Sequence, residues 1–226
     1  MEVNVLASAR ERMLALLRAH VRDTRVIAAM ASVPRERFVA EHLRARAYDD
    51  CALPIGEGQT ISQPLIVGLM IEALALQPDD LVLEIGTGCG YEAAVLSHLA
   101  CEVLTVERVP ALRERAQLLL DASGYANVHV YAAGDMLGLP ARAPYDAIIV
   151  TAAAPHVPHS LIGQLRSGGR LVVPTGDLRA QNLVRAVKTP RGVELTRLGS
   201  CAFVPLIGRD AWSQADVLDA SRGSKV

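Results

Sequence analysis

The chain has 226 residues, is 51% hydrophobic and carries a formal net charge of -1 at pH 7. This length suits one α/β domain with a single core, and the hydrophobic content excludes disorder for most of the chain. The balanced charge, without a block of Lys or Arg, argues against a nucleic-acid partner.

Three features of the sequence indicate where in the cell the protein is located: its N-terminus, its apolar stretches and its cysteines. Residues 1–20 alternate charged and apolar side chains, which is not the pattern of a signal peptide. The most apolar stretch, 64–78, contains Glu72 and is too short to span a bilayer. We therefore expect a soluble, cytoplasmic and monomeric protein without a membrane partner. The cysteines lack C-x-x-C spacing, which fits reduced thiols and argues against a zinc site: Cys51, Cys89, Cys101 and Cys201.

The N-terminal part of the chain is predicted to be helical around one glycine-rich loop. Apolar residues predict a helix over 10–20 and a shorter one over 26–32, which must end before the next proline. The stretch "IGEGQTISQP", 55–64, is predicted to be a loop. A helix is expected over 64–76, with its proline in the first turn.

From Leu81 onward, apolar strands alternate with helical segments. Such alternation predicts an α/β fold with a mostly parallel, doubly wound, Rossmann-like sheet that is covered on both faces. The expected strands are 81–86, 102–107, 128–135, 145–154 and 168–176, and the expected helices between them are 91–100, 111–123 and 161–165.

The C-terminal part has a different pattern. Two apolar runs flank a Pro-Arg-Gly turn at 190–192, which predicts an antiparallel hairpin at the edge of the sheet. The final residues, 220–226, are expected to form a frayed tail.

The stretch "VLEIGTGCGYEAAVL", 82–96, joins an apolar strand directly to a helix through Gly86, Gly88 and Gly90. Glycines at such a turn let the backbone bend sharply and let a ligand approach the chain closely. A dinucleotide loop needs a small residue at the sixth position, which here is Tyr91. The loop therefore favours a nucleoside without a pyrophosphate.

Three acidic residues fall at the ends of successive predicted strands. Glu107 lies about twenty residues beyond the loop, where a carboxylate can accept both hydroxyls of a ribose. Asp135 could hold an adenine amino group, and Glu84 can meet an ammonium group. A ligand with an adenine, a ribose and an amino-acid tail matches S-adenosylmethionine, which leaves S-adenosylhomocysteine after methyl transfer.

Several longer stretches make the chain similar to the protein-L-isoaspartate O-methyltransferase family of class I methyltransferases. Among them "GQTISQP", 58–64, is especially diagnostic. The resemblance implies methyl transfer from S-adenosylmethionine to the α-carboxylate of L-isoaspartyl residues in damaged proteins and peptides, followed by repair through a succinimide. The stretches that carry the resemblance are "VIAAMASVPRERFV", "AYDDCALPIGEGQTISQP", "VLEIGTGCGYEAAVL", "APYDAIIVTAAAPHVP", "QLRSGGRLVVPTG" and "FVPLIG".

The resemblance also implies one methyltransferase domain, with helices and a site loop over 1–80, a cofactor core over 81–180, edge strands over 181–210 and a tail over 211–226. Ser62 falls at the active-site position. With the glycines and acids above, the expected cofactor-binding residues are Gln59, Thr60, Ile61, Ser62, Glu84, Gly86, Gly88, Cys89, Gly90, Glu107, Arg108, Asp135 and Met136, and the expected substrate-binding residues are Ser62, Phe203, Val204 and Pro205.

Ser62 has no His, Lys or Cys within its own loop to act as a base. A carboxylate acceptor is already ionised at pH 7, because the reference pKa of such groups is about 4. It needs a fixed position and exclusion of water, and alignment of the reacting groups can contribute about 7–11 kcal/mol in favourable cases. We therefore expect the hydroxyl of Ser62 to orient the acceptor. In the alternative interpretation, Thr60 and Ser62 only cap the following helix.

One motif departs from the family pattern. The family usually has Gly-Asp-Gly where this chain has Met136 after the acid, with one residue fewer before Gly138. Three alternatives therefore stay open: a dedicated peptide aspartyl carboxyl methyltransferase, a non-catalytic adenosyl-nucleoside-binding module and, more remotely, a nicotinamide-dependent oxidoreductase. Tyr91 argues against the last, and the intact "GQTISQP" argues against a non-catalytic module. His156 and His159 lack an evident third ligand, so they are interpreted as loop residues and no metal is expected.

Overall fold

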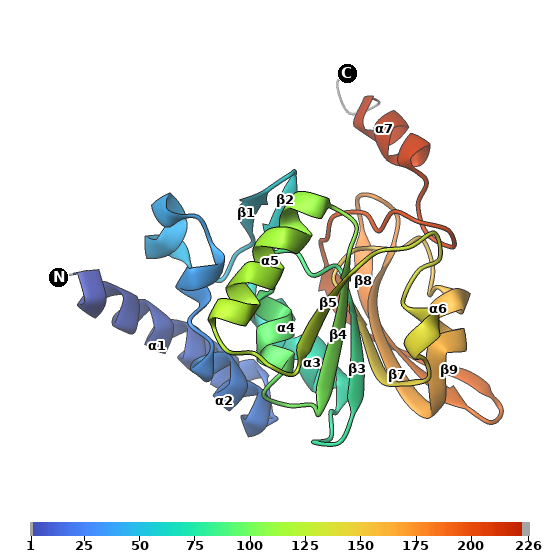
Figure 1. The fold of residues 1–226 in the computed structure, drawn as a ribbon, viewed down its shortest axis with the longest axis horizontal. Helices are drawn as coiled ribbons and strands as arrows, with labels where there is room; N and C mark the ends of the chain where they lie inside the picture. The colour runs from blue at the N-terminus through green and yellow to red at the C-terminus, as the bar shows by residue number, and fades with distance from the viewer. Residues whose placement is uncertain (1, 223–226) are drawn as a thin grey trace.

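A seven-stranded sheet forms the centre of the molecule in a computed structural model that describes residues 2–222 (Figure 1). The strand order is β5-β4-β3-β6-β7-β8-β9. The strands are β3 (Leu81–Ile85), β4 (Glu102–Glu107), β5 (Val128–Ala132), β6 (Tyr145–Val150), β7 (Leu165–Gly176), β8 (Gln181–Thr189) and β9 (Gly192–Cys201).

The sheet changes direction at β7. Strands β5, β4, β3, β6 and β7 pair in parallel, whereas β8 pairs antiparallel with both β7 and β9. In the edge hairpin, Thr189 lies opposite Gly192 across the turn. The predicted α/β fold with a mostly parallel sheet and an antiparallel edge hairpin is confirmed.

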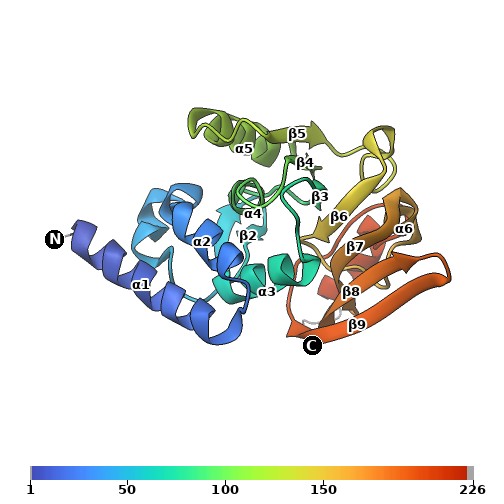
Figure 2. The ribbon, with the colours of Figure 1, turned by 90° about the horizontal axis from the view of Figure 1, so that it is seen from below.

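The two faces of the sheet are covered unequally. Alternate residues of one strand, such as Val82 and Leu83, belong to different cores because successive strand side chains point to opposite faces. Helices α1 to α5 lie on one side, and the short α6 lies on the other, together with Leu137 and Leu206 from two loops (Figure 2). The core helices are α3 (Pro64–Leu74), α4 (Tyr91–Leu96), α5 (Pro110–Ala122) and α6 (His159–Gln164).

The N-terminal part packs on the helical side. Helix α2 begins after Asp23, whose side chain accepts a hydrogen bond from the amide of Arg25. The stretch expected to be a loop contains a small antiparallel hairpin, with Gly56, Glu57 and Gly58 at positive φ in its turn. The elements of this part are α1 (Glu2–His20), α2 (Thr24–Ser32), two 3-10 turns, η1 (Arg35–Phe38) and η2 (Glu41–Arg46), and strands β1 (Leu53–Gly56) and β2 (Gln59–Ile61).

The C-terminal segment contains an element that was not expected. Helix α7 (Gln214–Arg222) occupies much of the stretch predicted to be a tail. The predicted fraying from residue 220 is wrong for 220–222, because the helix continues through them, and 223–226 lie outside the described residues. Within residues 2–222, no helix is both long enough and apolar enough to cross a bilayer.

Candidate active site

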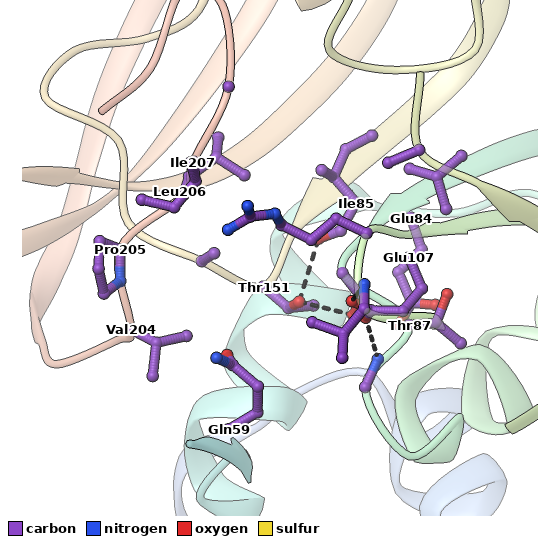
Figure 3. A pocket seen from close by; sticks show the side chains of 18 of the residues that line it. Gln59, Glu84, Ile85, Thr87, Glu107, Thr151, Val204, Pro205, Leu206 and Ile207 are labelled. Atoms are coloured by element: carbon purple, nitrogen blue, oxygen red, sulfur yellow. Dashed lines mark hydrogen bonds between the residues drawn. The ribbon is translucent and has the colours of Figure 1, made fainter. Parts of the chain in front are cut away.

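A cavity of about 650 Å³ lies at the carboxyl ends of the central parallel strands (Figure 3). Its walls come from the loop after β3, the end of β4, residues 133–138 after β5, and Thr151 after β6. The other walls are 58–62 and 204–208, which belong to segments far apart in the sequence. Ligands of open α/β sheets bind in this kind of crevice, and the volume suits a small molecule.

The loop after β3 is held close to the end of β6. Gly86 has φ +100°, and a Cβ on it would lie 2.3 Å from Oγ1 of Thr151. That hydroxyl is directed at the carbonyl oxygens of Ile85, at 3.0 Å, and Gly86, at 2.8 Å. Any side chain at residue 86 would therefore displace Thr151. Gly90, by contrast, does not line the cavity, and a Cβ there would lie 3.1 Å from Leu120, so this glycine serves helix packing.

Glu107 ends β4 and fixes the backbone around the cavity. One carboxylate oxygen accepts a hydrogen bond from the amide of Gly88 and the other from the amide of Val109, both at 2.9 Å. The side chain is buried but lines the cavity. Because a carboxylate oxygen can accept two hydrogen bonds, each one keeps a free lone pair for a ligand hydroxyl.

Glu84 lies one residue before the end of β3 and is fully buried. Its Oε2 accepts a hydrogen bond from the hydroxyl of Thr105 at 2.5 Å, and that hydroxyl lies 2.6 Å from the hydroxyl of Thr87. Its Oε1 is buried and has no partner in the part of the chain that the structure describes. Burial, with the nearby charge of Glu92, raises the pKa of Glu84 well above its usual value. A cationic ligand group would match this unpartnered oxygen.

Ser62 lines the cavity with a free hydroxyl and a fixed backbone. Nη2 of Arg35 donates to the carbonyl oxygen of Ser62 at 2.6 Å, and Nε donates to that of Ala47 at 2.7 Å. Within residues 2–222 the hydroxyl of Ser62 has no hydrogen-bond partner. Helix α3 has Gln63 as its N-cap without a side-chain hydrogen bond. The alternative in which Thr60 and Ser62 cap this helix is therefore wrong.

The segment 204–207 forms the wall across the cavity from Glu84 and Glu107 (Figure 3). The amide of Ala153 donates to the carbonyl oxygen of Val204, and the amide of Leu206 donates to that of Ala153, both at 2.8 Å. Val204 and Pro205 line the cavity as expected. Phe203 does not line it; its ring packs against the main core and its amide donates to Gln181.

The remaining expected cofactor residues line the cavity too. Burial raises the pKa of the Cys89 thiol to about 11, so this residue stays neutral at pH 7, as expected for a loop residue that is not a nucleophile. Asp135 and Met136 are exposed, and Met136 forms an isolated bridge with Arg209. The shortened segment therefore still contributes to the wall. The other expected lining residues are Gln59, Thr60, Ile61, Gly88 and Arg108.

Some lining residues were not predicted from the sequence. Thr151 could have been found, because it directly follows a strand whose carboxyl end faces the site. Tyr91 and Glu92 begin a helix after the glycine loop, and no sequence pattern indicated that they turn toward the cavity. Gln214 and Val217 lie on the unexpected α7.

The sequence matches one known protein family over most of its length. A family model described as "Protein-L-isoaspartate(D-aspartate) O-methyltransferase (PCMT)" matches residues 8–211. The protein-L-isoaspartate O-methyltransferase of Roseiflexus sp. (strain RS-1) is 52% identical over 208 residues, which cover 92% of this chain and 95% of the relative. That of Methanoculleus marisnigri is 49% identical over 214 residues, which cover 94% and 97%.

Solved structures share the fold. A protein-L-isoaspartate O-methyltransferase aligns with a TM-score of 0.81 and 29% identity, over 95% of this chain and 69% of its own. A Plasmodium falciparum protein in complex with S-adenosyl-L-homocysteine aligns with a TM-score of 0.78 over 88% of this chain and 99% of its own. At 23% identity this second likeness bears on the fold alone.

Proposed function

This chain belongs to the protein-L-isoaspartate O-methyltransferase family, and from that premise we propose which of its residues perform the reaction. The enzyme depends on S-adenosylmethionine and methylates isoaspartyl residues. S-adenosylmethionine, when bound, would supply a sulfonium methyl group to an oxygen of the isoaspartyl α-carboxylate, and its sulfur would keep the electron pair of the broken bond. The protein's task is to hold the two reactants in line.

The residues along β3 and β4 fit the cofactor. The unpartnered Oε1 of Glu84 matches the ammonium group of the methionine tail, and the free lone pairs of Glu107 match the two ribose hydroxyls. Asp135 and Met136, on the wall after β5, are assigned to the adenine. The glycine loop, with the neighbouring residues, allows close approach of the nucleoside: Gly86, Gly88, Cys89 and Arg108.

Ser62 orients the acceptor carboxylate. The observation that carries this assignment is a hydroxyl without a partner on the cavity wall, attached to a backbone that buried Arg35 holds in place. Such a hydroxyl can donate one hydrogen bond to the ionised carboxylate, and it removes no proton because the acceptor carries none. Gln59, Thr60 and Ile61 complete this side of the cavity.

The isoaspartyl segment of the substrate is assigned to the opposite wall. Val204 and Pro205 line the cavity, and the backbone bonds through Ala153 fix their position. Phe203 supports this wall from the core behind it. We further propose that the enzyme acts as a monomer on damaged proteins and peptides in the cytosol, where its four cysteines, all free thiols, would stay reduced.

The test is a methyl-transfer assay on two peptides that differ only in the isoaspartyl or aspartyl linkage of one residue. We expect the isoaspartyl peptide to be methylated at least tenfold faster. Preference for the aspartyl peptide would contradict repair and would support the dedicated peptide methyltransferase instead. The same chain with Ser62→Ala serves as the matched control, because the substitution leaves Glu84, Glu107 and the glycine loop unchanged.

A further inference from the structure

A second acidic side chain, Glu92, lies in the wall of the same cavity. It belongs to the first turn of α4, directly beyond the glycine loop, and only 6% of it is exposed. Its Oε1 is buried and finds no hydrogen-bond partner within residues 2–222, and the same is true of Oε1 of Glu84 and the hydroxyl of Tyr91. Buried polar atoms are almost always hydrogen-bonded, so three such atoms on one wall point to partners that a ligand supplies.

The proton content of this wall follows from its burial. Two carboxylates at this depth repel each other, and the pKa of Glu84 is raised well above its usual value by burial and by Glu92. Burial also raises the pKa of Glu92 to about 8, although the charge of Arg35 acts in the opposite direction. Glu92 is therefore mainly neutral at pH 7 and has a proton to donate.

The charged groups around the two acids differ. Glu84 faces the carboxylate of Glu107, whose negative charge favours a cation beside it. Glu92 and Tyr91 face the cation of Arg35, whose guanidinium carbon lies 4.7 Å from the ring centroid of Tyr91. Burial keeps the phenol of Tyr91 neutral, because it raises its pKa to about 12. The Glu92 end of the wall therefore favours an anion.

We propose that Glu92 binds the α-carboxylate of the cofactor's methionine tail by donating a hydrogen bond as a neutral acid, while Glu84 receives the ammonium group. This inference rests on the proposed function, since it assigns both ends of a zwitterionic tail to two acids of one cavity. Ionisation of Glu92 removes the donated hydrogen bond and places like charges side by side. The contribution of the tail carboxylate to affinity is therefore full below pH 8 and is lost as the pH rises through that value.

The experiment compares two ligands across pH. S-adenosylhomocysteine and its decarboxylated analogue share the nucleoside and an amine, so Glu84 and Glu107 meet the same groups in both ligands. The α-carboxylate lowers the pKa of the neighbouring amine, so both free ligands are titrated and each affinity is referred to the form with a protonated amine. The measured quantity is the affinity for S-adenosylhomocysteine divided by the affinity for the analogue, both determined by calorimetry. We expect this ratio to fall about tenfold between pH 7 and pH 9 in the unaltered enzyme, because a group with a pKa near 8 ionises over this range. A ratio that stays flat or rises would overturn the proposal.

The variant Glu92→Gln tests whether Glu92 causes the pH dependence of the affinity ratio. Glu92→Gln keeps the size and a hydrogen-bond donor but cannot ionise, so the ratio should stay within about twofold over the same range. Glu114→Gln, an exposed change on α5, should behave like the unaltered enzyme. A fall in Glu92→Gln as steep as in the unaltered enzyme would contradict the proposal. Should Glu92→Gln fail to fold, the unaltered enzyme alone decides.

Failure of this inference is distinguishable from failure of the proposed function. If S-adenosylhomocysteine does not bind, or the isoaspartyl peptide is not methylated, the proposed function fails and Glu92 fails with it. If both occur while the affinity ratio stays flat, only the role of Glu92 is overturned.

Discussion

The two walls of the cavity are stabilised by different kinds of groups, side chains in one wall and backbone groups in the other. On the wall from β3 and β4, the side chains of Glu84 and Glu107 accept hydrogen bonds from neighbouring groups and are buried. On the wall from 59–62 and 204–206, backbone groups make the bonds, and the side chain of Ser62 has no partner among residues 2–222.

The difference matches what each wall would bind. A cofactor is the same molecule in every turnover, so charged groups can be fixed in advance to meet it. Damaged proteins differ in the residues that flank the isoaspartyl residue. A wall fixed by its backbone can bind the isoaspartyl residue itself without contacts that depend on the flanking side chains. If the two walls are independent, a substitution in one wall should leave binding at the other unchanged.

The largest effect is expected at the residue that ties the two walls together. Arg35→Ala leaves two buried carbonyl oxygens without a donor and removes a side chain that stacks on Tyr91. We expect the free energy of unfolding to fall by about 3 kcal/mol in urea titrations, with methylation lost as well. Arg37→Ala, an exposed change in the same turn, should alter stability by less than about 0.5 kcal/mol. Equal stability of the two variants would contradict this role.

Glu107→Ala tests the cofactor wall alone. The substitution removes the acceptor of two backbone amides and the proposed ribose contact. Affinity for S-adenosylhomocysteine should fall about a hundredfold, since hydrogen bonds to a charged group contribute about 1.5–3 kcal/mol each. Calorimetry measures the affinity, and circular dichroism checks that the fold persists. An unchanged affinity would remove Glu107 from the ribose site.

Ser62→Ala tests the substrate wall alone. Losing one hydrogen bond to a carboxylate should lower kcat on an isoaspartyl peptide about thirtyfold, because such a bond contributes about 2 kcal/mol. The affinity for S-adenosylhomocysteine should change by less than about threefold. Parallel losses in kcat and cofactor affinity would show that Ser62 belongs to the cofactor loop and that the walls are not independent.

Gln181→Ala should have the smallest effect. Gln181 accepts from the amide of Phe203 at 2.7 Å and so supports the substrate wall from behind. Without it, the segment 203–205 is less well fixed, and KM for the peptide should rise about fivefold, in keeping with a loss of about 1 kcal/mol for one hydrogen bond. Steady-state kinetics with saturating cofactor measure the change. A change in kcat with no change in KM would speak against this support.

The sequence was sufficient for the parallel core because its strands are mostly apolar runs separated by helical segments, and two of them, β3 and β4, end beside glycine or at a glutamate. It did not indicate the β1–β2 hairpin, whose strands Leu53–Gly56 and Gln59–Ile61 are too short for alternation to show. It did not separate Phe203 from Val204, since this segment lies outside the named strands and only tertiary packing decides which side chain faces the cavity.

In the site too, the sequence predicted the residues that a pattern marks and missed those that tertiary packing places. Glu84, Glu107 and Ser62 were predicted because strand ends and a family motif mark them. Glu92 was not, because its function depends on the direction of one helical turn and on burial beside Arg35, and a linear sequence records neither.

Leu137 and Leu206 each have two roles, because they line the cavity and also belong to the core on the side of the sheet that carries α6. A molecule that occupies the cavity therefore restrains a layer that few helices protect. Occupancy should register as a rise in melting temperature and as slower cleavage by added protease near these two loops. A simple thermal-shift screen could then rank candidate nucleosides before any methylation is measured.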